Sequence, residues 1–161
     1  LVKAAVDRCG VSRETGAFLS GGLDSSTVCG ALQSLANEPV QAFSVGFAAE
    51  GYDEIEFAKA AARHFGLDHN VHYITPKEVS NAVPRVAKTY DEPFGNSSAV
   101  PTLVCAEFAQ SHGINRLLAG DGGDEIFTGN ARYQKQKIFE LYFAIPKVLR
   151  SSLIEPLLSS A

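Results

Sequence analysis

The sequence predicts an α/β fold with a parallel sheet and helices on both of its faces. Short apolar segments typical of buried strands alternate with longer segments whose apolar residues recur at helical spacing. The links between these segments are short, as in sheets whose parallel strands are joined by helices. Glycine-rich segments follow two of the strands, and ligands of such folds bind beyond the carboxyl ends of strands. We therefore expect one domain with its site at that edge of the sheet.

The first four predicted elements alternate between helix and strand. Apolar spacing predicts a helix over Leu1–Cys9 and another over Ser25–Leu35, which the turn at Asn37–Pro39 ends. Two apolar segments rich in β-forming residues predict buried strands over Thr15–Leu19 and Val40–Phe47.

The later elements follow the same alternation. A loop over Ala48–Tyr52 leads to a helix expected from Asp53 to Phe65, and Asp53 has the capping-box spacing to Glu56. His69–Ile74 predicts a third strand. The next helix is expected to begin with a capping box at Thr75 and Glu78, to continue to Tyr90, and to be interrupted or kinked at Pro84. A polar loop over Asp91–Ser98 is followed by a helix over Ala99–His112 and a short strand over Arg116–Ala119. A second glycine-rich loop, Gly120–Glu125, leads to further helical structure over Ile126–Leu149.

Composition and charge limit the classes of function. The chain has 161 residues, of which 45% are hydrophobic and 20% charged, as in soluble globular domains. A net charge of −4 without a basic run gives no support to nucleic-acid binding. No apolar stretch reaches the ~18 residues of a membrane-spanning helix, and Leu1–Lys3 does not open a signal peptide. The widely spaced Cys9, Cys29 and Cys105, odd in number and without metal-type spacing, are expected to be reduced, buried thiols of a cytoplasmic protein.

The segment Ser-Gly-Gly-Leu-Asp-Ser-Ser at Ser20–Ser26 has the features of an anion site. Glycines let the backbone approach a phosphate closely, and the first turn of the following helix directs N–H groups at it. The serines at Ser20, Ser25 and Ser26 add hydroxyl donors, and Asp24 beside a polyphosphate is best explained as a ligand of Mg²⁺. The alternative is a plain helix N-terminus, capped by Asp24 or Ser25 after a tight turn.

The second glycine-rich loop carries three carboxylates, Asp121, Asp124 and Glu125. Clustered carboxylates repel one another unless a cation or a proton compensates, although a solvated acidic turn is the alternative. Because a strand should place this loop beside the first one, we predict that Asp24 and Asp124 hold one Mg²⁺, with phosphate oxygens and water completing its coordination.

The first loop resembles the pyrophosphate loop of the N-type ATP pyrophosphatases, a group that includes asparagine, GMP, NAD and argininosuccinate synthetases. It lacks the Gly-Lys-Ser/Thr end of a Walker loop. The resemblance implies a Rossmann-like fold of the adenine nucleotide alpha hydrolase type. It also implies cleavage of ATP between its α and β phosphates, giving AMP and pyrophosphate.

Further segments narrow the resemblance to one family. They are Phe43–Phe47, Tyr52–Glu54, Asp91–Ser98 and Ala119–Phe127. Together with the first loop they resemble the synthetase domain of glutamine-dependent, class B asparagine synthetases, over about Phe18 to Tyr133. The β-lactam synthetases and peptide-cyclising relatives share this framework.

The resemblance implies roles for named positions. The residues that would hold the pyrophosphate part of ATP are Ser20, Gly21, Gly22, Asp24, Ser25 and Ser26. Phe18 or Leu19, together with Val45, would flank the adenine, and Ala119 and Gly120 would contact the nucleotide.

The remaining implied roles concern the metal and the reacting groups. Asp24 and Asp124 would be the Mg²⁺ ligands. Asp121, where many members have Glu, would lie next to the reacting carboxyl group as the catalytic residue. Ala119 replaces a serine that is common in the family, and Glu92–Ser98 would lie near the amino-acid substrate.

The implied reaction forms an amide in two steps. The side-chain carboxylate of aspartate attacks the α phosphorus of ATP, pyrophosphate leaves with Mg²⁺, and ammonia attacks the resulting acyl adenylate. In the family, ammonia comes from an N-terminal glutaminase domain that begins with a catalytic cysteine, and a lysine near the adenylate comes from later in the chain. The glutaminase segment is not found in the sequence and no lysine is placed in that role, so we expect residues 1–161 to be a truncated synthetase domain.

Two alternatives stay open. One is a nucleotide-binding module without turnover, and the other is a relative that acts on a different carboxylate, such as a sugar acid or a peptide side chain. The oligomeric state is also open, with a homodimer as one alternative. We expect surface or packing roles for His64, His69, His72 and His112, and solvated helix positions for Lys135, Lys137 and Lys147.

Overall fold

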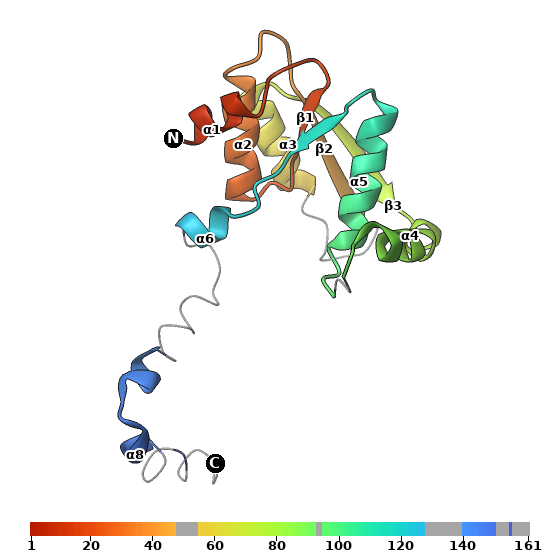
Figure 1. Cartoon of the computed structure of the whole chain (residues 1–161). Coiled ribbons are helices and arrows are strands. Elements are labelled where there is room, and N and C mark those ends of the chain that lie inside the picture. Colours follow the sequence, from red (N-terminus) through yellow and green to blue (C-terminus); the bar gives the residue numbers. More distant parts are fainter. Residues whose placement is uncertain (48–54, 93–94, 128–139, 151–154, 156–161) are drawn as a thin grey trace. The chain divides into compact units, whose positions relative to one another are not determined.

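The structure, a computed structural model, describes residues 1–47, 55–92, 95–127, 140–150 and 155 (Figure 1). By contacts the chain divides into two compact units, Leu1–Asp121 and Gly122–Ala161, and each is described by itself. The described residues include no helix long and apolar enough to cross a membrane.

The first unit is built on a four-stranded sheet in the order β3-β2-β1-β4. Its strands are β1 (Thr15–Phe18), β2 (Gln41–Phe47), β3 (Asp68–Ile74) and β4 (Arg116–Leu118). All three pairings between neighbouring strands are parallel. The predicted fold class is therefore confirmed.

Helices cover both faces of this sheet (Figure 1). They are α1 (Val2–Arg8), α2 (Leu23–Gln33), α3 (Ile55–Phe65), α4 (Pro76–Thr89) and α5 (Ala99–Ser111). Every predicted strand, and every predicted helix of this unit whose ends are described, lies within two residues of its observed bounds. The expected loop over 48–52 and the expected cap at Asp53 fall outside the described residues.

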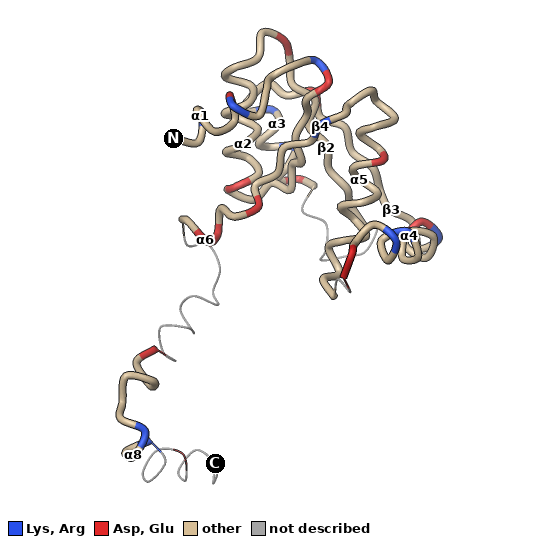
Figure 2. Tube along the Cα trace, viewed as in Figure 1, with Lys and Arg blue, Asp and Glu red and all other residues tan. Residues whose placement is uncertain are grey.

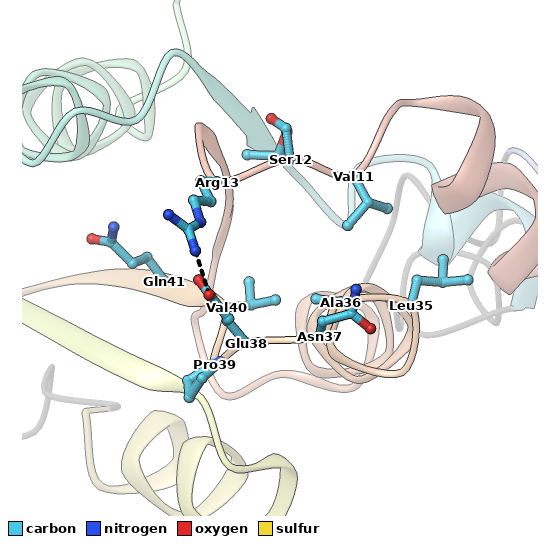
Figure 3. Close-up of a pocket in the computed structure, with 11 residues that line it drawn as sticks. Val11, Ser12, Arg13, Leu35, Ala36, Asn37, Glu38, Pro39, Val40 and Gln41 are labelled. Atoms are coloured by element: carbon cyan, nitrogen blue, oxygen red, sulfur yellow. Dashed lines mark hydrogen bonds and ion pairs between the residues drawn. The ribbon is translucent and has the colours of Figure 1, made fainter.

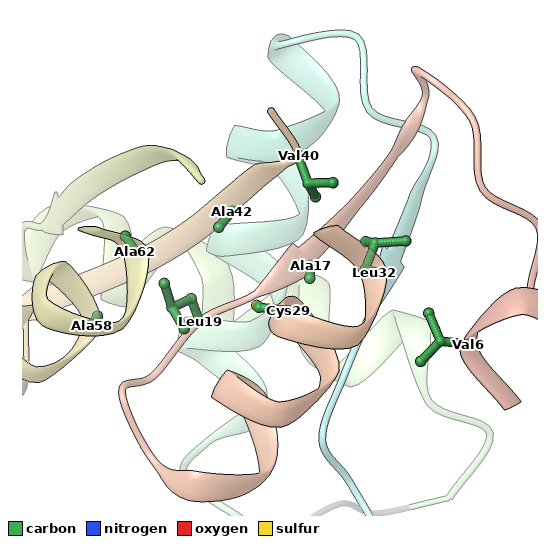
Figure 4. Close-up of a cluster of buried hydrophobic side chains, with 9 residues drawn as sticks. All are labelled: Val6, Ala17, Leu19, Cys29, Leu32, Val40, Ala42, Ala58 and Ala62. Carbon is green, nitrogen blue, oxygen red and sulfur yellow. The ribbon is translucent and has the colours of Figure 1, made fainter. Parts of the chain in front are cut away.

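Side-chain alternation along the strands creates two cores. Ala42 of β2 belongs to the cluster under α1, α2 and α3, whereas its neighbour Phe43 belongs to the cluster under α5. Figure 4 shows the first cluster, in which Leu19 and Leu32 fill the space between sheet and helices. Burying a leucine fully contributes about 1.5–3 kcal/mol. Small residues such as Ala58 allow α3 to approach the sheet closely.

The second core lies on the opposite face of the sheet. Phe43 meets Cys105 of α5, and a neighbouring cluster joins Ile74 of β3 to Ala82 of α4 and Val104 of α5. The helix α4 continues through Pro84 without a break in its bounds, so the expected interruption is absent there.

The three cysteines are free thiols, and the expectation that all are buried is wrong for Cys9. Cys9 is exposed as the C-cap residue of α1, whereas the buried residue of that helix is Val6. Burial raises the pKa of the Cys29 and Cys105 thiols to about 12, so neither is a reactive thiolate at neutral pH.

The second unit contains short helical segments. The helix α6 (Gly123–Phe127) starts earlier than predicted, so Asp124 and Glu125 lie in its first turn, where acidic side chains favour a helix. Residues 140–144 are helical, and the chain bends before Pro146 and the short helix α8 (Lys147–Leu149), since proline has no N–H for a helical bond. The Arg150 guanidinium lies 4.8 Å from the centroid of the Phe143 ring.

The capping box predicted at the start of α4 is present. The Thr75 N–H and hydroxyl both donate to Glu78 Oε2 at 2.7 Å, and Glu78 N–H donates to Thr75 Oγ1 at 3.3 Å. The other carboxylate oxygen of Glu78 lies 2.8 Å from His72 Nε2. These bonds, first those from Thr75 and then that from His72, lower the pKa of Glu78 to about 2.

This carboxylate should make stability depend on pH in the acid range. Because the pKa of Glu78 is lower in the folded than in the unfolded chain, its contribution is complete above about 4.5 and is lost as the pH falls towards 2. We expect Glu78→Gln to flatten the decline of unfolding free energy over that range, as measured by urea titrations at several pH values. An unchanged slope would contradict this assignment.

Candidate functional site

The first glycine-rich loop connects β1 to α2 and is held by its own serine hydroxyls. Ser20 Oγ and Ser25 Oγ lie 2.9 Å apart, and the Ser20 N–H donates to Ser25 Oγ at 3.2 Å. The Gly22 N–H donates to Ser20 Oγ at 3.2 Å. Ser25 is buried and its hydroxyl also donates to the Gly22 carbonyl. This side chain therefore stabilises the conformation of the loop through hydrogen bonds within it.

The N-terminus of α2 is free of a side-chain cap. Gly22 is the N-cap residue, and no side chain accepts a hydrogen bond from the first turn as a cap. The alternative in which Asp24 or Ser25 caps this helix is therefore wrong. An uncapped first turn of an eleven-residue helix directs backbone N–H groups outward, which is the arrangement that binds anions.

Gly21 is required by both its conformation and its surroundings. Its φ of 85° lies in the left-handed region, and a Cβ there would approach Ala58 N to 2.5 Å and Phe57 Cβ to 2.6 Å. The loop is thus pressed against the start of α3, and a side chain at this position would displace it.

The second glycine-rich loop begins beside the first, as the sequence predicts. The strands β4 and β1 pair in parallel, with Leu118 opposite Ala17. The loops that follow these two strands therefore leave the sheet at the same edge. A Cβ at Gly120 would lie 2.7 Å from Ser25 N and 2.9 Å from Asp24 Cβ. Only a residue without a side chain lets the second loop touch the first turn of α2 this closely.

The predicted acidic residues divide between the two units. Asp121 is exposed at the end of the first unit, whereas Asp124 and Glu125 belong to α6 in the second unit. The pairing of Asp24 with Asp124 stays a prediction. No cluster of three or more potential metal ligands occurs within the described ranges.

The charge around the loops also favours a cation. Neither Ser20–Ser26 nor Gly120–Glu125 contains Lys or Arg. Figure 2 shows acidic rather than basic positions at the start of α2 and at the end of β4. A polyphosphate bound here would meet backbone N–H groups and carboxylates, and Mg²⁺ is the usual bridge between phosphate oxygens and carboxylates.

The three residues expected to flank a base lie on different faces of the sheet. Phe18 and Val45 are partly exposed and pack on the same cluster as Phe43. Leu19 is only 1% exposed and is enclosed by the opposite core under α2 and α3. Of the two alternatives offered by the sequence, Phe18 therefore has the surface that a planar ring could contact.

The structure describes most of the other positions expected near the site. Ala119 is exposed and Gly120 partly exposed at the end of β4, and Ser26 is partly exposed on α2. Within Glu92–Ser98, residues 93–94 lie outside the described part of the chain, and the Ser98 N–H donates to Asn96 Oδ1 at 3.0 Å.

Sequence reasoning missed Ser44. This serine is 4% exposed in the middle of β2, and its hydroxyl donates to the Leu19 carbonyl directly before the first loop. The available signal was a single hydroxyl among the apolar residues in the middle of the strand, because a buried hydroxyl must find partners.

A separate cavity of about 580 Å³ lies at the opposite, amino-terminal edge of the sheet (Figure 3). Residues before β1 and between α2 and β2 line it, and the Arg13 guanidinium lies 2.5 Å from Glu38 Oε1 across these two segments. The Gln33 side chain fixes the second segment by accepting from the Val40 N–H at 2.8 Å. None of the predicted site residues lines this cavity.

Comparison with known proteins gives consistent similarities. All 161 residues match the asparagine synthase family. The chain is 36% identical over 136 residues to a putative asparagine synthetase (glutamine-hydrolyzing) 2 of Methanocaldococcus jannaschii, covering 84% of this chain and 26% of that protein. It is 32% identical over 139 residues to asparagine synthetase (glutamine-hydrolyzing) 1 of Bacillus subtilis, covering 86% and 22%. The chain thus spans about a quarter of the length of these curated relatives.

Among solved structures, the chain is similar to an NH3-dependent NAD synthetase from Campylobacter jejuni. The TM-score is 0.44 at 14% sequence identity, covering 70% of this chain and 49% of that one.

Proposed function

The chain belongs to the asparagine synthase family, and on that basis we propose that its first unit binds Mg·ATP and activates a carboxylate for amide formation. The observation that carries the proposal is the contact of Gly120 with the uncapped first turn of α2. The second loop starts against the uncapped first turn of α2, where backbone N–H groups suit a polyphosphate, and this closeness supports the proposal.

The nucleotide would lie across the carboxyl ends of β1, β2 and β4. Its pyrophosphate part would rest on the loop residues: Ser20, Gly21, Gly22, Asp24, Ser25 and Ser26. The adenine would contact Phe18 and Val45, and Ala119 and Gly120 would contact the remainder of the nucleotide. The exposure of Phe18, Val45 and Ala119 supports this orientation.

The metal would be held by Asp24 and Asp124, with phosphate oxygens as its other ligands. When bound, Mg²⁺ supplies the positive charge that offsets the charge developing on pyrophosphate. The absence of Lys and Arg from both loops supports a cation in this role. The uncapped N–H groups of α2 would share the task by donating to the phosphate oxygens.

The reaction we propose is adenylation followed by amide formation. A carboxylate, in the first instance the side chain of aspartate, attacks the α phosphorus and pyrophosphate leaves. Ammonia then attacks the acyl carbon, and AMP and a proton leave. Asp121 would lie next to the reacting carboxyl, and Glu92–Ser98 would bind the amino acid. The chain's own contribution is positioning and charge stabilisation, since no side chain need form a covalent bond.

The source of ammonia follows from the relatives. Their names describe glutamine-hydrolyzing enzymes, and we propose that glutamine-derived ammonia reaches this site as well. The chain covers about a quarter of the length of those proteins.

Exchange of radiolabelled pyrophosphate into ATP tests the adenylation step. We expect exchange that depends on both Mg²⁺ and aspartate. If exchange requires a different carboxylate, that carboxylate is the substrate in place of aspartate, and the proposed adenylation step stands. Calorimetric binding of Mg·ATP with no exchange for any carboxylate would instead leave a nucleotide-binding module without turnover.

A further inference from the structure

The peptide group between Leu19 and Ser20 joins the sheet to the first glycine-rich loop, and side chains hold it at both ends. Its N–H belongs to Ser20 and donates to Ser25 Oγ of α2 at 3.2 Å. Its carbonyl belongs to Leu19 and accepts the hydroxyl of Ser44 from β2. The orientation of this peptide sets the direction in which the loop leaves the strand, because the next rotatable bonds are those of the loop itself.

The Ser44 hydroxyl is itself fixed by His69 of β3. The Nε2 atom of His69 lies 2.6 Å from Ser44 Oγ, and Ser44 is 4% exposed. A hydroxyl has one hydrogen, and Ser44 gives it to the Leu19 carbonyl, so His69 must donate from Nε2. Burial, and to a lesser extent the Lys59 ammonium, lower the pKa of His69, so the ring is neutral at physiological pH with its proton on Nε2.

These bonds form one chain from the edge strand to the loop. It leads from His69 through Ser44 to the Leu19–Ser20 peptide, and from there to Ser25 and Ser20 Oγ. We propose that His69 is a positioning residue for the nucleotide loop, acting through Ser44; the inference rests on the proposed function of that loop.

Removing the His69 imidazole should make the first glycine-rich loop more mobile, although the substitution is not in the loop itself. Ser44 Oγ would lose its donor partner and could rotate away from the Leu19 carbonyl, leaving that peptide held at one end only. Small displacements of groups that position a substrate reduce function by factors of up to about 100. For loss of one remote bond we expect about tenfold weaker Mg·ATP binding, by comparison with the losses of about 10–100-fold seen when a residue that orients a metal ligand is removed.

The test compares substitutions at two histidines of the same strand. His69→Leu removes the donor, whereas His69→Gln keeps an N–H donor at a similar reach. His72→Leu is the matched control, because His72 is also hydrogen bonded, to Glu78 at 2.8 Å, but belongs to the α4 cap rather than the loop. Amide hydrogen exchange of Ser20, Gly21 and Gly22 in the ligand-free chain reports on the loop, and calorimetry reports on Mg·ATP.

The proposal predicts a specific pattern. His69→Leu should speed exchange of the Ser20 amide and weaken Mg·ATP binding about tenfold, while His69→Gln should restore both. His72→Leu should change neither, even where it lowers the melting temperature as much. Ser44→Ala should match His69→Leu, and the double variant should lose nothing further, as expected for residues that act through one another.

Equal Ser20 exchange and equal affinity in His69→Leu and His72→Leu would overturn the proposal, as would a failure of His69→Gln to differ from His69→Leu. The two hypotheses fail separately. If the unsubstituted chain does not bind Mg·ATP, the proposed function fails, and the exchange rates still decide whether His69 positions the loop.

Discussion

Replacing Asp24 with Asn should weaken Mg·ATP binding by on the order of 100-fold, or about 2.7 kcal/mol. Asp24 lies in the uncapped first turn of α2, beside Gly120 of the second loop. Because neither loop contains Lys or Arg, the carboxylate can assist phosphate binding only through a cation. Isothermal calorimetry with Mg·ATP measures the loss directly.

The same variant should behave differently when Mg²⁺ is removed. In excess chelator, Asp24→Asn should bind free ATP at least as well as the unsubstituted chain, since a carboxylate beside a phosphate is then only repulsive. Asp124→Asn should share this dependence on Mg²⁺ if both residues hold the ion. Asp7→Asn, at an exposed position of α1, makes the same change of charge as a control.

A loss of affinity that is equal with and without Mg²⁺ would contradict the metal assignment. It would indicate instead that Asp24 matters for the helix, where an acidic residue in the first turn contributes about 0.3–1 kcal/mol. Thermal unfolding of Asp24→Asn without nucleotide separates these two effects.

Features that depend on neighbours in sequence could be predicted from the sequence. The capping box at Thr75 and Glu78 involves residues three apart, and its hydrogen bonds are all present. Two adjacent glycines follow the first strand, and the positive φ of Gly21 uses the conformational freedom that glycine provides. The meeting of the two glycine-rich loops required one further step, the rule that parallel strands end at a common edge.

Features that depend on register and on the choice of face could not be predicted in this way. The sequence left Phe18 and Leu19 as equal alternatives, because adjacent strand residues exchange faces when the register shifts by one. The pairing of Ala17 with Ala42 sets the register, and Leu19 belongs to the core under α2. The bond from His69 to Ser44 joins two neighbouring strands, β3 and β2. It therefore depends on their register, and a single histidine in the sequence of a strand does not predict it.

The acidic loop shows a third kind of limit. Asp124 and Glu125 were expected in an irregular turn, but they begin α6, because acidic side chains are favourable in the first turn of a helix. Carboxylates between glycines are compatible with both structures, and local composition alone does not distinguish them.

Substituting Gly120 with alanine should have the second large effect, on both stability and nucleotide binding. The added Cβ would lie 2.7 Å from Ser25 N and 2.8 Å from the Asp24 carbonyl carbon, which are backbone atoms that cannot rotate away. Such overpacking costs about 1–3 kcal/mol of folding stability. Relief requires the two loops to separate, so we expect Mg·ATP affinity to fall by at least about tenfold, in keeping with the cost of misplaced binding groups.

Gly113→Ala provides the matched control for this prediction. Gly113 precedes β4, whereas Gly120 follows it, and Gly113 has a φ of 81° with no atom within 4 Å of an added Cβ. Its substitution should cost on the order of 1 kcal/mol through backbone strain and leave nucleotide affinity unchanged. Urea unfolding and calorimetry on both variants separate general destabilisation from damage to the site. If Gly120→Ala bound Mg·ATP as tightly as Gly113→Ala, the contact between the loops would not be part of a nucleotide site.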